Sequence, residues 1–456
     1  MRKTAAEPAH SALRNLPSIE RILSSAALQP LLETFGRERV KEAAVAHLAD
    51  LRARRAAYTP EAAVASMHAA LSIAVSSTLR RVINGTGILI HTNLGRSPID
   101  PQLWERAGAI ATGYSNLEFD LEEGGRGARD EHLAAVCRSL FNAEAAVLAN
   151  NNAAGTLLVL AAVAAGREVI VSRGELVEIG GSFRVPDVIQ QGGARLREVG
   201  TTNRTRAHDY AAAITNETAA ILRVHRSNFE IVGFTETPSI EELVSVAGSR
   251  NIPMLYDEGS GRVVDLAPYG FASAPTIREL LASGVDVVTC STDKLIGATQ
   301  GGLILGKAEI ISKVKKHPLM RALRAGKESY AVIAETLRAF ATARHESVIP
   351  IYRMLATPLD ALRARAEELA RGTSAKIVET QCALGGGTTP TETIPSVGIE
   401  LAAPLQSDPP IIGRTQNDRF VIDVRTLLEE DLAPVALAIR RAGVPPASGR
   451  TSRPGE

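Results

Sequence analysis

Short apolar runs alternate with helical patterns along most of this chain, and this alternation constrains the fold more than any other feature. Between residues 82 and 311, strand-like runs are separated by segments whose apolar residues recur every three to four positions. Such alternation is typical of a mainly parallel sheet covered by helices. The predicted fold class is therefore α/β, with strands expected at residues 168–172, 194–199, 219–224, 253–256 and 285–289 and a further candidate at 145–149.

The main catalytic candidate follows the last of these strands. Lys294 has the hydroxyl residues Ser291 and Thr292 before it and the glycines Gly301 and Gly302 after it. A strand fixes the position of such a lysine, burial lowers the pKa of its amine, and small residues leave room for a cofactor, as a Schiff base with pyridoxal phosphate requires. Lys294 is therefore predicted to be catalytic; the alternative is a surface lysine at a strand end.

Polar residues at three earlier strand ends support the same cofactor. Asp257 can pair with the pyridine nitrogen and hold it protonated, and either Asn228 or His225 can reach the ring oxygen. The segment 150–156 opens a helix whose backbone N–H groups suit the cofactor phosphate. Each feature alone is also common in ordinary caps and turns. The predicted cofactor-binding residues are Asn151, Asn152, Ala153, Asn228, Asp257, Ser291 and Lys294, of which Lys294 and Asp257 are catalytic.

Composition argues against a structural metal and a membrane span. The chain has 456 residues and only three cysteines, Cys137, Cys290 and Cys382, none of them at metal-ligand spacing. This predicts a reducing, cytoplasmic location and no metal. The longest apolar run, residues 155–166, is too short to cross a bilayer. An aromatic content of 4% argues against stacking on unpaired bases, so an RNA partner would be read by shape and phosphate contacts.

Charge is unevenly distributed along the chain. The net charge is +1, yet the first 81 residues carry 12 Lys and Arg against 7 Asp and Glu. In this region Val40, Ala44, Leu48 and Leu51 recur at helical spacing, so one helix face can pack while the other meets phosphate. A solvated charged face without RNA is the alternative. The basic residues concerned are Arg37, Arg39, Lys41, Arg52, Arg54 and Arg55.

These patterns predict four regions. Residues 1–80 form a helical N-terminal module, which begins with a polar, flexible segment of about 12 residues, and residues 81–330 form the large cofactor-binding domain. A linking helix and a small C-terminal α+β domain follow at 331–444, with strands at 375–379, 396–400 and 419–424 and a glycine-rich loop at 385–390. Residues 445–456 are predicted to be a disordered tail.

Many blocks of the sequence, spread over nearly its whole length, resemble the bacterial selenocysteine synthase family. They include HTNLGR at 91–96, GYSNLEFD at 113–120 and SRGELVEIGGSFR at 172–184, and further blocks at 16–23, 82–87, 199–205 and 420–426. The resemblance implies a fold-type I pyridoxal-phosphate enzyme that converts seryl-tRNA(Sec) to selenocysteinyl-tRNA(Sec) with selenophosphate. It also implies a homo-oligomer, a ring of dimers (homodecamer), whose N-terminal module grips the tRNA.

The resemblance implies a mechanism and assigns a role to three arginines. Seryl-tRNA(Sec) is expected to form an aldimine with the cofactor and to lose its hydroxyl, leaving an aminoacrylyl-tRNA that accepts selenium. The residues alone do not identify the general acid for that loss. Arg96, Arg321 and Arg324 are expected to bind the phosphate of the selenium donor; by sequence alone they are ordinary surface arginines, although Arg321 and Arg324 share a helix face.

Two positions depart from the family pattern. Glu258 stands where leucine is more frequent after the aspartate, which adds a carboxylate near the ring, and Ser291-Thr292 stands where serine-glycine is usual. The departures can tune the site or indicate a paralogue, and two alternatives to the transferase stay open. The chain can be a pyridoxal-phosphate lyase of a small amino acid, which would have no use for a basic N-terminal module. It can also be a non-catalytic tRNA-binding scaffold, which would need no Schiff-base lysine.

Overall fold

The chain divides into two units at Arg81. The computed structural model describes residues 16–75, 77–179 and 183–443. Its contacts separate residues 1–81 from residues 82–456, and each unit has its own core. The predicted disordered tail and the predicted flexible start lie outside the described residues.

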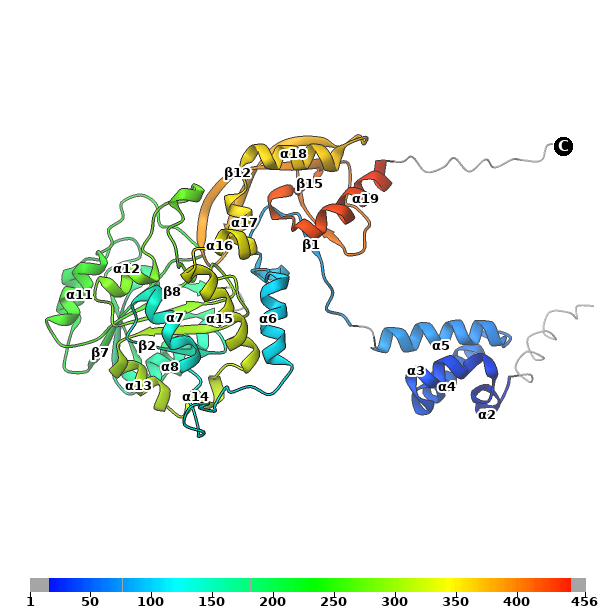
Figure 1. The fold of residues 1–456 in the computed structure, drawn as a ribbon, viewed down its shortest axis with the longest axis horizontal. Helices are drawn as coiled ribbons and strands as arrows, with labels where there is room; N and C mark the ends of the chain where they lie inside the picture. Colours follow the sequence, from blue (N-terminus) through cyan, green and yellow to red (C-terminus); the bar gives the residue numbers. More distant parts are fainter. Residues whose placement is uncertain (1–15, 76, 180–182, 444–456) are drawn as a thin grey trace, which may run out of the picture. The chain divides into compact units, whose positions relative to one another are not determined.

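The first unit consists of short helices around a small core (Figure 1). Gly36, at a φ of 77°, ends one helix and precedes the next without a longer loop. On the longest helix the predicted apolar positions are buried, and the six basic residues on this helix and at its C-cap are exposed. The helices are α2 (Ile19–Leu23), α3 (Gln29–Phe35), α4 (Arg37–Arg54) and α5 (Pro60–Val75), with a 3-10 turn at η1 (Ala26–Leu28).

The second unit is built on a seven-stranded sheet, which confirms the predicted α/β class. Six strands are parallel and only β10 (Gly302–Gly306) runs antiparallel, between β2 and β9. The predicted strands are present, each within three residues of its expected limits. In sheet order the remaining strands are β2 (Ala145–Ala149), then β9 (Val287–Ser291), β8 (Met254–Gly259), β7 (Thr218–Val224), β3 (Glu168–Ser172) and β6 (Arg195–Val199).

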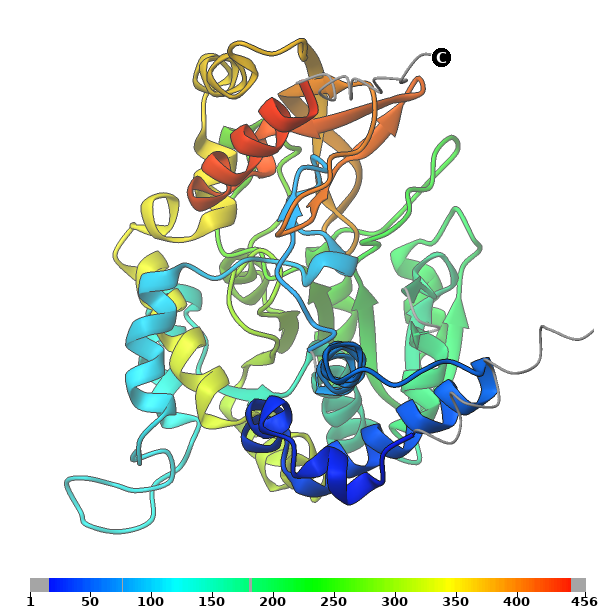
Figure 2. The same ribbon diagram turned by 90° about the vertical axis from the view of Figure 1, so that its right-hand side faces the viewer.

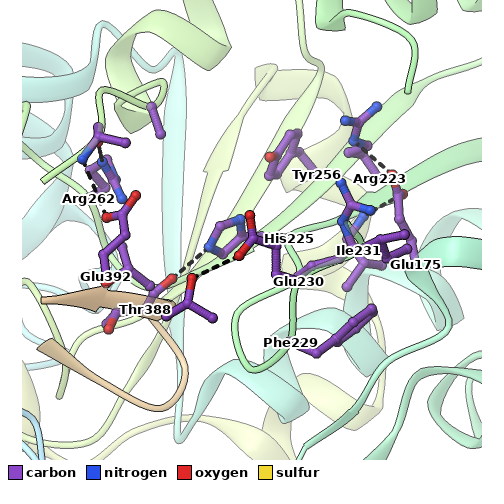
Figure 3. A pocket seen from close by; sticks show the side chains of 16 residues that line it. Glu175, Arg223, His225, Phe229, Glu230, Ile231, Tyr256, Arg262, Thr388 and Glu392 are labelled. Atoms are coloured by element: carbon purple, nitrogen blue, oxygen red, sulfur yellow. Dashed lines mark hydrogen bonds and ion pairs between the residues drawn. The ribbon is translucent and has the colours of Figure 1, made fainter. Parts of the chain in front are cut away.

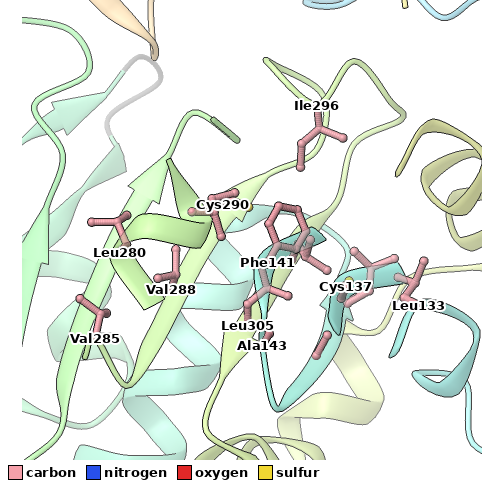
Figure 4. Packing of buried hydrophobic residues seen from close by; sticks show 14 of the residues in the cluster. Leu133, Cys137, Phe141, Ala143, Leu280, Val285, Val288, Cys290, Ile296 and Leu305 are labelled. Atoms are coloured by element: carbon pink, nitrogen blue, oxygen red, sulfur yellow. The ribbon is translucent and has the colours of Figure 1, made fainter. Parts of the chain in front are cut away.

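Helices cover both faces of this sheet, as the two buried clusters show. One face packs against α7 (Glu131–Phe141), α11 (Ile240–Gly248), α12 (Ile277–Ala282) and α15 (Lys327–Ala341). Figure 4 shows part of this layer, where Cys137 and Phe141 of α7 lie near Val288, Cys290 and Leu305 of the sheet. The other face packs against α8 (Asn152–Ala164), α9 (Val185–Gln191) and α13 (Ala308–Lys316).

The C-terminal part forms a smaller antiparallel sheet covered on one face by two helices (Figure 2). Its first two strands make a long hairpin, in which the predicted 385–390 loop is a turn at 386–388 flanked by strand residues. The sheet order is β11 (Lys376–Gly385), β12 (Thr389–Leu401), β15 (Arg419–Asp423) and β14 (Arg414–Gln416), with α18 (Leu359–Ala370) and α19 (Leu432–Gly443) packed on it.

The parallel register brings the functional candidates together. The strands β2, β7, β8 and β9 all end at the same edge of the sheet, since parallel strands present their carboxyl ends together. The residues that follow them include Asn151, His225 and Lys294. In the described part of the chain, no helix is both long enough and apolar enough to cross a membrane.

Gly302 sets how closely the sheet can approach the start of α8. A Cβ at this position would overlap the carbonyl oxygen of Asn151. We therefore expect Gly302→Ala to lower the free energy of unfolding by roughly 1–3 kcal/mol, because the overlap forces the backbone apart. Gly125→Ala is the matched control, since no atom lies within 4 Å of its added Cβ. Denaturant unfolding of both variants tests this, and equal stability would contradict the role given to Gly302.

Candidate active site

Lys294 lies in a buried turn after β9. Its backbone is fixed by bonds around it: the Thr292 amide donates to the Gly301 carbonyl at 3.0 Å, and the Leu295 amide to Ser260 at 3.0 Å. The Nζ atom lies 3.2 Å from the carbonyl oxygen of Gly387. Burial lowers the pKa of the Lys294 amine, although the carboxylates of Asp257 and Asp293 oppose this shift. The amine is thus more easily deprotonated than that of an exposed lysine.

Asp257 lies on β8, the strand next to β9, and its carboxylate is buried. Oδ1 accepts hydrogen bonds from Asn152 Nδ2 at 2.7 Å and from Thr289 Oγ1 at 3.3 Å. Burial raises the pKa of Asp257, while the bond from Asn152 and the charge of Lys294 lower it. A buried carboxylate with two neutral donors is suited to receive a further, cationic partner.

The start of α8 supplies backbone donors beside these two groups. Asn151 is the N-cap, and its side chain accepts from the Ala154 amide. The amides of Asn152 and Ala153 are the first two of the helix, so no carbonyl of the helix can bind them. A helix of 13 residues with such free amide donors at its N-terminus is suited to binding a phosphate.

A cavity of about 190 Å³ joins these groups. It is lined by seven residues singled out from the sequence: Arg96, Asn151, Asn152, Ala153, Asp257, Ser291 and Lys294. The buried Oδ1 atom of Asn152 has no hydrogen-bond partner among the residues that the structure describes. A buried amine, a buried carboxylate and free helix amides around one small cavity fit pyridoxal phosphate, whose aldehyde, ring nitrogen and phosphate need these three partners.

His225, and not Asn228, lines this cavity. The ring nitrogen Nε2 of His225 lies 2.9 Å from the carbonyl oxygen of Thr388, so this nitrogen carries the proton. Asn228 is exposed, and its Nδ2 donates to the carbonyl of Glu178 at 2.6 Å. Of the two residues predicted to reach the ring oxygen, the structure brings only His225 to the site.

The three arginines expected to bind the selenium donor are separated within one chain. Arg96 lines the cavity and forms an ion pair with Asp293 at 2.6 Å. Arg324 pairs with Glu118 at 3.0 Å, and Arg321 is exposed; neither lines the cavity. Asp293 was not among the predicted site residues, although its position directly before Lys294 was a usable signal.

Both departures from the family pattern are accommodated by local hydrogen bonds. Glu258 points away from Asp257 along the strand and accepts from the Ser260 hydroxyl and, at 2.6 Å, from the Gly261 amide. Thr292 donates to the carbonyl of Thr299 at 2.6 Å. The Glu258 side chain therefore caps a turn and does not line the cavity as a second ring carboxylate.

Sequence reasoning also missed the contribution of the small domain. Gly387, at the tip of the β11–β12 hairpin, provides the carbonyl that accepts from Lys294, and its own amide donates to Ser227 at 3.0 Å. A Cβ on Gly387 would lie 2.6 Å from Lys294 Nζ. Its glycine-rich surroundings were the available signal. In the described ranges no three His, Cys, Asp or Glu residues gather as a metal site.

We expect Asn152→Ala to weaken pyridoxal-phosphate binding roughly 10- to 100-fold, the value of a hydrogen bond to a charged group. Because this bond lowers the pKa of Asp257, its loss raises that pKa further, so ionised Asp257 is lost at a higher pH as the pH falls. The defect should thus grow towards acidic pH. Absorbance titration of the cofactor-free protein measures it.

Asn228→Ala is the matched control for this measurement. It removes an equivalent amide from a neighbouring loop outside the cavity, so cofactor affinity should stay at the wild-type value. A loss equal to that of Asn152→Ala would instead give Asn228 the cofactor contact predicted from the sequence.

Known proteins with similar sequences identify the family to which this chain belongs. Residues 82–428 match the family described as L-seryl-tRNA selenium transferase, and residues 13–52 match the selenocysteine synthase N-terminal domain. The L-seryl-tRNA(Sec) selenium transferase of Hyphomonas neptunium is 44% identical over 95% of this chain and 99% of its own length. That of Geobacter sulfurreducens is 43% identical over 93% and 98%.

One solved structure shows that the fold of the second unit is a known one. D-Glucosaminate-6-phosphate ammonia-lyase superposes with a TM-score of 0.59 at 22% identity, over 80% of this chain and 96% of the lyase. At this level of identity the likeness concerns the fold alone. The sequence relatives, unlike this structural neighbour, identify the family: this chain belongs to the L-seryl-tRNA selenium transferase family.

Proposed function

We propose that this chain converts L-seryl-tRNA(Sec) to L-selenocysteinyl-tRNA(Sec) with selenophosphate, using Lys294 and Asp257 as catalytic residues. It is a pyridoxal-phosphate enzyme of the transferase family. The observation that supports these roles is that the Lys294 amine and the Asp257 carboxylate line one small cavity at the start of α8. The lyase and scaffold alternatives are not retained, because neither explains membership of this family over nearly the whole chain.

Each end of the cofactor has a candidate partner. The backbone amides of Asn152 and Ala153 would hold the phosphate, and Asp257 would hold a proton at the pyridine nitrogen. His225, which donates to Thr388 through Nε2, would lie beside the ring. When bound, pyridoxal phosphate supplies an electron sink for negative charge at the α-carbon of serine.

Lys294 is the base in this proposal. Burial lowers the pKa of its amine, which favours the neutral form that can take the α-proton of the seryl group and return it after selenium has been added. Asp257 keeps the ring nitrogen protonated during both transfers. Lys294 thus carries the proton that is transferred to and from the α-carbon, while Asp257 holds the proton that stays on the ring nitrogen.

The selenium donor needs a cationic site, which Arg96 can supply beside Lys294. A selenophosphate phosphate would compete with Asp293 for the Arg96 guanidinium, which is partly exposed. Arg321 and Arg324 lie outside the cavity of their own chain. In a homo-oligomer, for which we propose a ring of dimers in the cytoplasm, they are available to the site of another copy.

We expect Lys294→Ala to abolish the visible absorbance of the bound cofactor and selenium transfer, because Lys294 is the one lysine among the described residues that line the cavity. Lys376→Ala removes an exposed lysine of β11 and is the control; its absorbance and activity should equal those of the wild type. Absorbance spectra with an assay of selenium transfer to seryl-tRNA(Sec) test this. A Lys294→Ala protein that kept its colour would exclude Lys294 as the cofactor lysine.

We also expect Arg39→Glu and Arg52→Glu to weaken tRNA binding without changing the cofactor absorbance. Both side chains are exposed on α4. Each arginine that contacts a phosphate contributes about 1 to the salt dependence of log K, so the slope should fall by roughly that amount per substitution. Lys376→Glu controls for total charge. Unchanged slopes for both arginine variants would assign tRNA binding to another surface.

A further inference from the structure

A second, larger cavity adjoins the Lys294 cavity. It measures about 310 Å³ and shares Val224 and His225 with its neighbour. Figure 3 shows Arg262 and Glu392 on one side, Glu175 and Arg223 on the other, and His225 and Glu230 between them. The bond from His225 to Thr388 joins the large domain to the β11–β12 hairpin at this boundary.

The reaction requires a neighbouring site of this kind. The serine of the substrate is esterified to the ribose of the last tRNA nucleoside, so this nucleoside must lie a few covalent bonds from Lys294. At about 190 Å³ the Lys294 cavity is below the range of roughly 300–1,000 Å³ that is usual for small-ligand sites. In the proposed reaction, the cofactor and the serine would already occupy this cavity. The second cavity, at about 310 Å³, falls within that range.

The second cavity contains a buried cation with spare donors. Arg262 is 3% exposed and lines the cavity. The hydrogen bond of its guanidinium within the described chain is a long one, 3.5 Å from Nη1 to the Ala272 carbonyl. Buried guanidinium groups normally satisfy several donors, so the free ones call for an acceptor from a ligand.

Charges in the cavity are balanced, which argues against a phosphate. Glu175 and Arg223 form a buried ion pair at 3.0 Å, and Glu230 accepts from Thr391 at 2.9 Å. With Glu392 and Arg226 also in the lining, acidic and basic side chains are equal in number. Carboxylates repel a selenophosphate but accept from amino and hydroxyl groups, so a neutral, polar ligand fits best.

We propose that this cavity binds the 3′-terminal adenosine of the aminoacyl-tRNA, with the base stacked on Phe229. Phe229 is the aromatic side chain of the loop after β7 that lines the cavity, and it is half-buried. The adenine edge and the ribose hydroxyls meet Arg262 and the carboxylates. A single nucleoside needs only one ring, so the low aromatic content of the chain is no obstacle. This assignment rests on the proposed transferase function.

The test compares uncharged tRNA(Sec) ending in CCA with the same tRNA lacking the terminal adenosine, bound to the cofactor-loaded protein. Wild-type protein should prefer the complete tRNA roughly tenfold, as expected for one stacked base. Phe229→Leu keeps the apolar packing but removes the ring, so both tRNAs should bind equally. Phe229→Tyr should restore the preference. Phe234→Ala, on the same loop but 91% exposed, should leave the preference at its wild-type value.

Three results would overturn the proposal. The first is a wild-type protein with no preference for the complete tRNA. The second is a Phe229→Leu protein that keeps the preference with an unchanged KM for selenophosphate. The third is a Phe229→Leu protein that keeps the preference while its KM for selenophosphate rises, which would assign the cavity to the selenium donor. Failure of the transferase function itself would give a different result. The wild-type protein and all variants at position 229 would then bind neither tRNA and would transfer no selenium.

Discussion

The hydrogen bond from Asn152 to Asp257 ties the start of α8 to the end of β8, and the arrangement of the site depends on it. Asn152 offers its backbone amide on the phosphate side and its side chain on the side of the carboxylate. In the proposed binding mode, this one residue would therefore contact both the phosphate and the carboxylate that faces the ring nitrogen. The bond also opposes the rise in the pKa of Asp257 that burial causes.

Burial acts in opposite directions on the two groups that we propose to be catalytic. It raises the pKa of the Asp257 carboxyl and lowers that of the Lys294 amine, because a low dielectric disfavours the charged form of each. The mutual attraction of the two groups limits both shifts. A cationic ring nitrogen beside Asp257 would stabilise its ionised form, while the amine is used for bonding or proton transfer.

Close backbone approach matters as much as charge in this site. Gly302 lets β10 pass against the start of α8, and Gly387 lets the small-domain hairpin reach Lys294. Through Gly387, Thr388 and their partners Ser227 and His225, the two domains of the second unit meet at the cofactor cavity. The position of the small domain is thus coupled to the environment of the catalytic amine.

The sequence by itself determined the α/β class, the strands and the candidates Lys294, Asp257 and Asn151 to Ala153, because these depend on local periodicity and on residues next to strand ends. The parallel register then brings such residues to one edge. Only the tertiary structure chose His225 over Asn228, turned Glu258 away from the cavity, separated Arg321 and Arg324 from Arg96, and brought Gly387 to Lys294. Those outcomes depend on side-chain direction after the chain has left a strand and on contacts between segments far apart in sequence, and no local pattern encodes either.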